Sequence, residues 1–289
     1  MCSSDLTQAL GSFTVHEADA GLTFGESDTN TGAGGTGPVT VLNTDGAINF
    51  GVGTNVIGSA SGGTGITLNG GAATLTITTT GDQVRFNGAT TLNSGLRIDS
   101  NNGDILFTND APLDSQASET NDVTLNAGTG VIRFNEDLGA QQALGVFTIE
   151  AASQVLFGES DTETTGSGST GPVNVVRTNG AINLGSLSVI DDGNASTNDI
   201  VFNGGASELV VSTTNDNIRL NGTVELQSDL HLTTGAGSGD ISFTRFATIN
   251  SQATENNSLT LTAGTDRKRN TSELQSHLNL VCRLLLEKK

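Results

Sequence analysis

The sequence predicts an all-β protein folded as a right-handed parallel β-helix, a solenoid with about 20–27 residues per coil. Three observations lead to this prediction. Short apolar-x-apolar triplets occur along the chain, their spacing is nearly regular, and a long stretch of sequence occurs twice. Units of this kind are stable when they stack, because each unit covers the apolar face of its neighbour.

The triplets predict short strands. Val84-Arg85-Phe86, Ile105-Leu106-Phe107 and Ile132-Arg133-Phe134 alternate apolar and other side chains, with Gly, Asn, Asp, Ser or Thr between the triplets. Alternation with a period of two and many β-branched residues is typical of strands about 3–5 residues long. No stretch with helical periodicity precedes Asp266, so we expect no helix before that position.

The spacing of the triplets predicts the coils. Triplets that begin at Val84, Ile105, Ile132, Val155 and Ile182 follow one another at intervals of about 21–27 residues. Each interval contains a further triplet, which indicates two or three strands per coil. At about 4.8 Å per coil, roughly eleven coils would span about 50 Å.

Asn-Gly pairs leave an alternative fold open. Asn-Gly follows a predicted strand at Asn87 and again at Asn221, and it is also the strongest signal for a hairpin. A series of antiparallel, immunoglobulin-like sandwiches would use such turns. Sandwich domains usually have longer strands and a bulky core aromatic, so we favour the solenoid.

The long repeat divides the chain into two copies. LGSFTV at Leu10–Val15 returns as LGVFTI at Leu144–Ile149, and FGESDT at Phe24–Thr29 returns at Phe157–Thr162. The offset between matching segments stays nearly constant along the chain, at about 135 residues. We therefore expect one solenoid copy over 7–140 and a second, truncated copy over 141–265.

The two ends differ from the rest. Six of the 12 basic residues and all three Lys lie in 266–289, which contains no Gly. TSELQSH and LVCRLLLEKK in this tail, and MCSSDL at 1–6, resemble translations of a sequencing adapter. We expect both segments to be artefacts, and they are excluded from the fold prediction. In the remaining 7–265, acidic residues far outnumber the basic ones, which are all Arg.

Composition limits the partners and the compartment. A net charge of −19 argues against nucleic acid and anionic membranes as partners. Two Cys, Cys2 and Cys282, cannot form a disulfide scaffold, and no apolar run reaches the roughly 18 residues of a membrane span. We expect no membrane insertion, and we find no export signal at the start of the sequence.

Acidic turns are the candidate metal ligands. Glu26-Ser27-Asp28 and its repeat Glu159-Ser160-Asp161 lie beside Gly-rich loops, where carboxylates could hold calcium. The nonapeptide calcium signature is missing, so we favour solvated acidic turns and assign no metal ligand or cofactor. Four further acidic residues before strands fit turns that bond their own backbone: Asp82, Asp104, Asp216 and Asp240.

No catalytic group stands out. Arg85, Arg133 and Arg219 occupy the middle of triplets and should point outward, balancing charge, with a glycan or sulfate contact as the alternative. His16 and His231 are not repeated between the copies, and we expect both at the surface. We therefore assign no catalytic residue and predict that the chain is not an enzyme.

Three motifs resemble a known class of protein. GDI-x-F at Gly103–Phe107, V-x-L-x-AGTG-x-I-x-F at Val123–Phe134 and A-L-G-x-F-T-I at Ala143–Ile149 resemble the repeat region of filamentous-haemagglutinin-like and autotransporter-type bacterial surface adhesins. The resemblance covers nearly all of 7–265. It implies a secreted, surface-displayed stalk that meets a host or environmental surface through an unknown glycan or protein ligand.

Two other functions remain open. Right-handed β-helices also carry polysaccharide lyases and glycosidases, whose sites need paired carboxylates or a basic residue with calcium. The absence of Lys from 7–265 and the duplication of the unit argue against such an enzyme. A calcium-binding repeat module is the other alternative.

Overall fold

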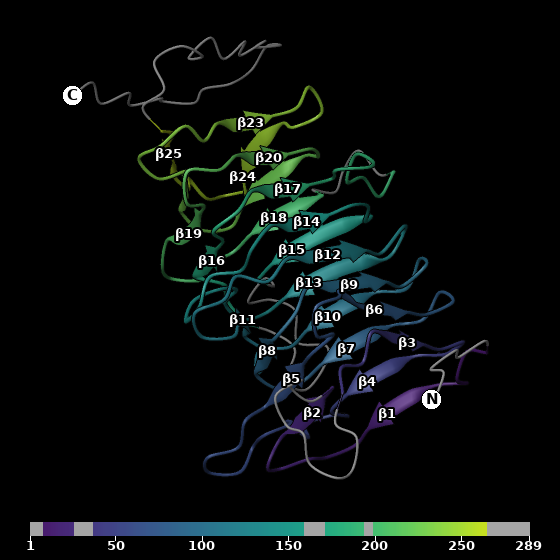
Figure 1. Cartoon of the computed structure of the whole chain (residues 1–289). Helices are drawn as coiled ribbons and strands as arrows, with labels where there is room; N and C mark the ends of the chain where they lie inside the picture. The colour runs from purple at the N-terminus through teal and green to yellow at the C-terminus, as the bar shows by residue number, and fades with distance from the viewer. Residues whose placement is uncertain (1–7, 26–36, 159–170, 194–198, 265–289) are drawn as a thin grey trace.

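The computed structural model describes residues 8–25, 37–158, 171–193 and 199–264. This part of the chain holds 25 strands and no helix, stacked as a column of coils (Figure 1). All the strand pairings in it are parallel; for example, Ile105 pairs with Val84 on one side and Ile132 on the other. The prediction of a parallel β-solenoid is confirmed, and the antiparallel sandwich is wrong.

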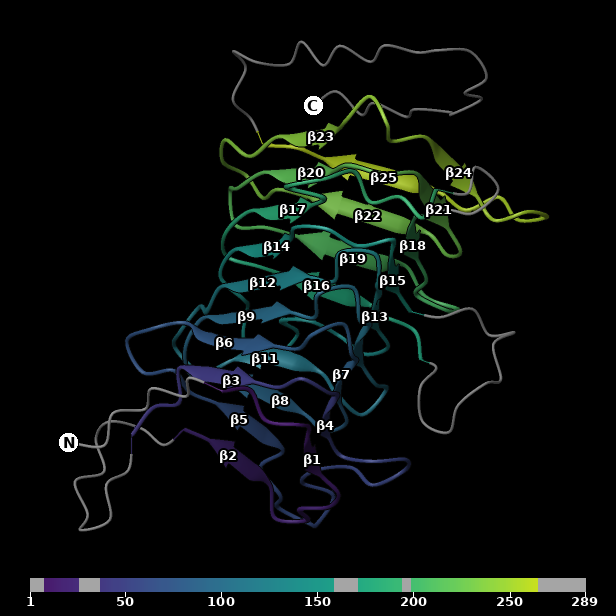
Figure 2. The same cartoon turned by 90° about the vertical axis from the view of Figure 1, so that its right-hand side faces the viewer.

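The chain passes through three faces in each coil (Figure 2). The first face is a nine-stranded sheet: β1 (Phe13–Val15), β4 (Ile48–Phe50), β7 (Val84–Phe86), β10 (Ile105–Phe107), β13 (Val131–Phe134), β15 (Gln154–Phe157), β18 (Ile200–Phe202), β21 (Val224–Leu226) and β24 (Ile249–Ser251). The third face is an eight-stranded sheet: β3 (Val41–Asn43), β6 (Leu75–Thr78), β9 (Leu96–Asp99), β12 (Val123–Asn126), β14 (Phe147–Ile149), β17 (Ile182–Leu184), β20 (Ile218–Leu220) and β23 (Ile241–Phe243).

The second face consists of two four-stranded sheets. The strands of the first are β2 (Leu22–Phe24), β5 (Ile66–Leu68), β8 (Thr90–Leu92) and β11 (Leu113–Ser115). Those of the second are β16 (Val175–Arg177), β19 (Leu209–Ser212), β22 (Leu230–Thr233) and β25 (Leu259–Thr262). Leu138 joins the two, because it bridges to Leu113 below and Val176 above. The second face therefore continues through both copies of the repeat.

The coils are fewer, and some are longer, than the spacing predicted. Nine strands stack on the first face, against the eleven coils expected. Val155 pairs with Ile200, well beyond Ile182, whereas Ile182 pairs with Phe147 on the third face. The triplet pattern was wrong here because it cannot tell a strand on the next face from a strand one coil later.

Most coils nevertheless have the expected length. Five of the eight steps along the first face lie within the predicted range of about 20–27 residues. The three longer steps run from Phe13 to Ile48, from Ile48 to Val84 and from Val155 to Ile200. In the step from Ile48 to Val84, which is described throughout, the additional residues lie in the connection 51–65 between β4 and β5. The ladder pairing therefore stays in register through long and short coils alike.

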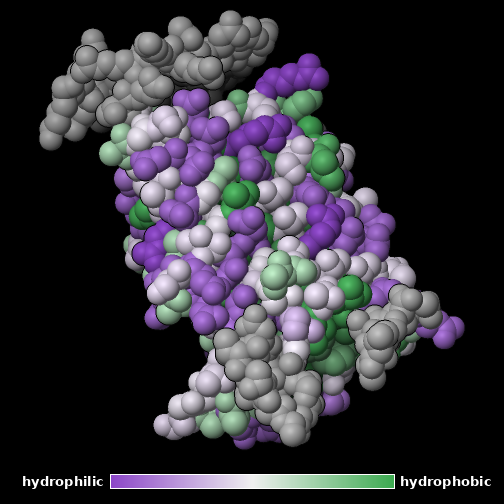
Figure 3. All heavy atoms as spheres, viewed as in Figure 1, coloured by the Kyte–Doolittle hydropathy of each residue, from purple (hydrophilic) through white to green (hydrophobic). Residues whose placement is uncertain are grey.

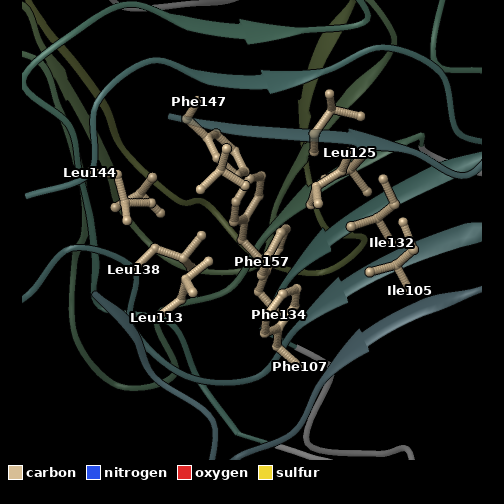
Figure 4. Packing of buried hydrophobic residues seen from close by; sticks show 14 of the residues in the cluster. Ile105, Phe107, Leu113, Leu125, Ile132, Phe134, Leu138, Leu144, Phe147 and Phe157 are labelled. Carbon is tan, nitrogen blue, oxygen red and sulfur yellow. The ribbon is translucent and has the colours of Figure 1, made fainter. Parts of the chain in front are cut away.

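One apolar core runs through both copies (Figure 4). Alternate residues of each strand point inward and stack in columns, because parallel pairing places the same strand position directly above its neighbour. On the first face the inward column contains six Phe rings in succession: Phe50, Phe86, Phe107, Phe134, Phe157 and Phe202. Neighbouring centroids lie 4.6–5.3 Å apart, with nearly parallel planes.

Matching corners of the two copies need glycine. Gly51 follows β4 with φ +87°, and its counterpart Gly185 follows β17 with φ +76°. A Cβ at Gly51 would lie 2.6 Å from the Asn55 carbonyl oxygen, and one at Gly185 would lie 2.7 Å from that of Ser188. Both the left-handed backbone and the close approach exclude a side chain.

Truncating the middle of the Phe column should destabilise the solenoid strongly. Phe107 is 1% exposed and stacks on Phe86 and Phe134, at 4.6 and 5.3 Å. We expect Phe107→Ala to cost about 3–5 kcal/mol, since a large buried side chain leaves a cavity. Urea unfolding followed by circular dichroism measures this.

A matched control is Leu187→Ala. Leu187 is 74% exposed, so its truncation should change stability by less than about 0.5 kcal/mol. Equal unfolding midpoints for the two variants would contradict the stacked core.

Candidate functional site

A shallow polar groove lies at the corner where the chain passes from the second face to the third. It has a volume of about 480 Å³. Its walls are three successive turns of the solenoid: 71–74 between β5 and β6, 93–95 between β8 and β9, and 119–122 between β11 and β12. Small residues form the floor, and Glu119 and Asn121 stand on one wall.

The second copy carries the same groove. Its volume is about 270 Å³, and it is lined by 205–208, 227–229, Glu255 and Asn257. These residues are the repeat counterparts of the residues that line the first groove. It lies between β18 and β19, β21 and β22, and β24 and β25, at the corner from the first face to the second.

The same hydrogen bonds build both grooves. In the first copy, the Asn121 amide donates to the Leu92 carbonyl at 2.8 Å and to Glu119 Oε2 at 3.1 Å. In the second, Asn257 donates to the Leu226 carbonyl and to Glu255 Oε2, both at 2.8 Å. The asparagine therefore fixes a glutamate at the rim of each groove.

A buried serine closes the floor of each groove. Gly70 N–H donates to Ser94 Oγ at 2.7 Å, and Gly204 N–H donates to Ser228 Oγ at the same distance. Each groove thus presents a fixed carboxylate and a polar lining suited to a polar, hydrogen-bonding ligand. Sequence reasoning missed the grooves because their walls come from turns one coil apart in the sequence, which look like ordinary loop residues.

Three carboxylates form the candidate metal centre. Oxygens of Asp191, Asp192 and Asp199 lie within 4.8 Å of one another. Asp199 is buried; its Oδ2 accepts from Thr223 Oγ1 at 2.6 Å, while Asp191 and Asp192 are exposed. Oxygen ligands of this kind suit calcium. The first copy has Gly65 where the second has Asp199, so the cluster is not repeated.

The sequence prediction pointed to other acids. Glu26–Asp28 and Glu159–Asp161 lie outside the described residues. The available signal for the cluster was the pair Asp191-Asp192 followed by Gly193; the structure places the Asp199 carboxylate beside that pair.

The acidic turn residues serve the neighbouring coil. Asp104 Oδ1 accepts from Val131 N–H, one coil on, at 2.8 Å, so the prediction that it bonds its own backbone is wrong. Asp82 and Asp216 take part through their main chain, whose carbonyls accept from the Thr79 and Thr213 hydroxyls. The Asp240 amide donates to Asn217 Oδ1 at 2.8 Å.

The outward arginines bind the backbone. Arg85 donates to the Gly51 and Gly53 carbonyls, and Arg219 donates to that of Gly185 at 2.9 Å. Their outward position is as predicted, and their hydrogen bonds go to main-chain oxygens. Charge balance stays a prediction for both. Burial lowers the pKa of Arg85, and the charge of Asp110 partly offsets that effect.

Three other predicted surface residues are located as follows. Arg133 is half-buried on the outward side of β13. His16 is exposed, as predicted. His231 lies in β22, where its Nε2 is 2.9 Å from Thr262 Oγ1, so it is partly covered rather than free at the surface.

Glu136 is a carboxyl with a shifted pKa. Burial raises the pKa of Glu136, the hydrogen bond from the Asp137 N–H partly offsets the rise, and the charges of Asp137 and Asp110 add to it. A raised carboxyl pKa is a property of general acids. Its neighbour Asp137 accepts from the Asn174 and Val175 amides at 2.7 and 2.9 Å, and so serves the next coil.

An ion pair crosses the junction of the two copies. Arg97 in β9 donates to both carboxylate oxygens of Glu150, which follows β14, at 2.9 and 2.7 Å. The hydrogen bonds to Glu150 are the main reason why the pKa of Arg97 is raised. His16 occupies the position of Glu150 in the first copy, and His231 that of Arg97 in the second. The pair therefore belongs to the junction and not to the repeat.

No family model, curated protein or solved structure matches the chain. The described residues include no helix capable of crossing a membrane. Figure 3 shows that the side of the molecule seen in Figure 1 is mostly hydrophilic, with small, separate hydrophobic patches.

The junction pair should contribute modestly to stability. The two side chains are 33% and 16% exposed, so solvent screens part of their attraction. A double-mutant cycle with Arg97→Ala and Glu150→Ala should give a coupling energy of about 0.5–1 kcal/mol that falls as salt rises.

A second double-mutant cycle, with Arg245→Ala in place of Arg97→Ala, provides the control. Arg245 stacks on Phe246, 4.5 Å from its ring centroid, and should be additive with Glu150→Ala. An Arg97–Glu150 coupling no larger than that of the control would show that the pair is not stabilising.

Proposed function

We propose that this chain is a segment of the structural and adhesive shaft of a large secreted bacterial surface protein, of the filamentous-haemagglutinin-like or autotransporter type. The observation that carries the proposal is the unbroken nine-stranded parallel sheet that spans both copies. A chain stacked in this way converts each added coil into about 4.8 Å of length.

The core supports a role in extension. Stacked Phe rings and matching apolar columns join every coil to the next. The two copies therefore form one continuous column instead of two separate domains. The surplus of acidic residues keeps the surface charged, which opposes edge-to-edge association of neighbouring shafts. The two polar grooves are the surfaces where an adhesive contact would form.

A shaft should grow in one dimension when a unit is added. The test is to insert a second copy of residues 10–143 after residue 143, which adds one full unit. Small-angle X-ray scattering should show a maximum dimension larger by about 22 Å, with an unchanged cross-section, since the insert supplies fourteen further strand positions at three per coil. An enlarged cross-section without the added length would contradict the shaft.

Adhesion and catalysis can be separated with the same protein. The shaft proposal expects retention on an immobilised glycan or matrix-protein array without release of sugar products. Release of reducing ends or unsaturated sugars from a soluble polysaccharide would instead favour the carbohydrate-active enzyme. No retention on any array would remove the adhesive part of the proposal.

A second candidate function is calcium binding at Asp191, Asp192 and Asp199, favoured by their convergence within 4.8 Å. Extracellular calcium sites bind in the range of about 0.1–1 mM. With calcium at about 10 mM, well above that range, we therefore expect the melting temperature to rise by about 3–10 °C.

The matched variant is Asp191→Asn/Asp192→Asn, which keeps Asp199 and its bond to Thr223. It should not respond to calcium, and magnesium should have a smaller effect on the unmodified chain. Equal melting temperatures with calcium and with chelator in the unmodified chain would exclude the site.

A further inference from the structure

Matching strands of the two copies lie on different faces of the solenoid. β1 and β7 belong to the first face, but their counterparts β14 and β20 belong to the third. β2 and β5, on the second face, correspond to β15 and β18 on the first. β3 and β6, on the third face, correspond to β16 and β19 on the second. The displacement has the same direction in every case.

The displacement follows from the length of the unit. Counting the Leu138 bridge as one position, β1 to β14 is fourteen strand positions. Three positions make one coil, so one unit makes four and two-thirds coils. A second copy therefore starts two faces further round than the first.

The two copies keep their local structure while they are turned. Thr108 Oγ1 donates to Asn87 Oδ1 at 2.7 Å, and Thr244 Oγ1 donates to Asn221 Oδ1 at the same distance. Thr44 and Thr178 bond the carbonyls of Gly46 and Gly180, both at 2.6 Å. The second copy is therefore rotated relative to the first as one unit, and the hydrogen bonds at its corners are unchanged.

Differences between the copies fit this winding. Phe50 and Phe86, in the first-face column, become Leu184 and Leu220 on the third face. Leu68 on the second face becomes Phe202 on the first, where it joins the Phe column. These exchanges keep the aromatic column on one face although the unit has turned. Phe147 and Phe243, the counterparts of Phe13 and Phe107, do not follow and lie on the third face in β14 and β23.

We infer that each successive copy of the unit is turned by two-thirds of a coil about the solenoid axis, so that its polar groove is displayed on a different edge in each copy. The groove at Asn121 lies on the edge between the second and third faces, and the groove at Asn257 lies on the edge between the first and second. Three units, or fourteen coils, return the groove to the same edge after about 67 Å.

The carboxylates and polar lining of the grooves suit hydrogen-bonding ligands. The inference concerns how the units wind, and it does not depend on whether the shaft is adhesive.

Disulfide trapping at the junction tests the winding. Thr124 in β12 pairs with Thr148 in β14, and both side chains face outward. Without the turn, β14 would lie on the first face beside β13, opposite Arg133. In a Cys2→Ser/Cys282→Ser background, Thr124→Cys/Thr148→Cys should therefore oxidise to an intramolecular disulfide, and Arg133→Cys/Thr148→Cys should not.

A second junction pair and a pair within one copy complete the test. Arg133→Cys/Leu156→Cys should also form a disulfide, because Arg133 pairs with Leu156. Thr67→Cys/Thr91→Cys, within the first copy, should form one under either arrangement and controls for oxidation and folding. Mass spectrometry after alkylation, with and without reduction, counts the free thiols.

The outcomes separate the two arrangements. Formation of both junction disulfides, with none between positions 133 and 148, supports the turned winding. Formation of the 133–148 disulfide overturns it. If the pair within the first copy forms and neither junction pair does, the inference is overturned as well.

Discussion

The structure depends on one constraint: every coil must match the next, residue for residue, over three faces. Parallel ladders repeat at about 4.8 Å, which is close to the spacing at which aromatic rings stack. One residue per coil can therefore build a continuous aromatic column, as Phe86 and Phe107 do with centroids 4.6 Å apart. Because this requirement acts only at inward positions, the corners and outward positions are free to vary. The polar groups found there are consequences of that freedom.

The polar groups mostly serve the ladder itself. Asp104, Arg85 and Asn121 each bond main-chain groups of another coil, satisfying donors or acceptors that the corners leave unpaired. A carboxylate or guanidinium in a turn is thus a poor indication of a ligand site in this fold. The grooves differ from such turns, since their glutamates are held at a rim and both copies share the arrangement.

The sequence predicted the fold class better than it predicted the number of coils or the side-chain clusters. Alternating triplets predicted the parallel solenoid, because periodicity reports which side chains point inward, and that pattern alone determines the columns. The number of coils was wrong, since the interval from Val155 to Ile182 looks like a coil but joins different faces. The Asp191–Asp199 cluster and the Arg97–Glu150 pair were missed because each brings together residues that are separated in the sequence. Whether such residues meet depends on which strands pair with one another. The triplet pattern does not predict this pairing of strands between coils.

One repeat unit is not a whole number of coils, and this has a physical consequence for a long array of units. If a unit made a whole number of coils, matching corners, such as the groove corners that carry Glu119 and Glu255, would lie on the same edge in each copy. Bulk and negative charge would then accumulate along one side, bending the column and leaving a uniform, uncovered side for lateral association. A unit of four and two-thirds coils moves this corner from the edge between the second and third faces to the edge between the first and second. Charge and bulk are thereby averaged around the axis over three units, and the column can lengthen by duplication without acquiring a one-sided curvature.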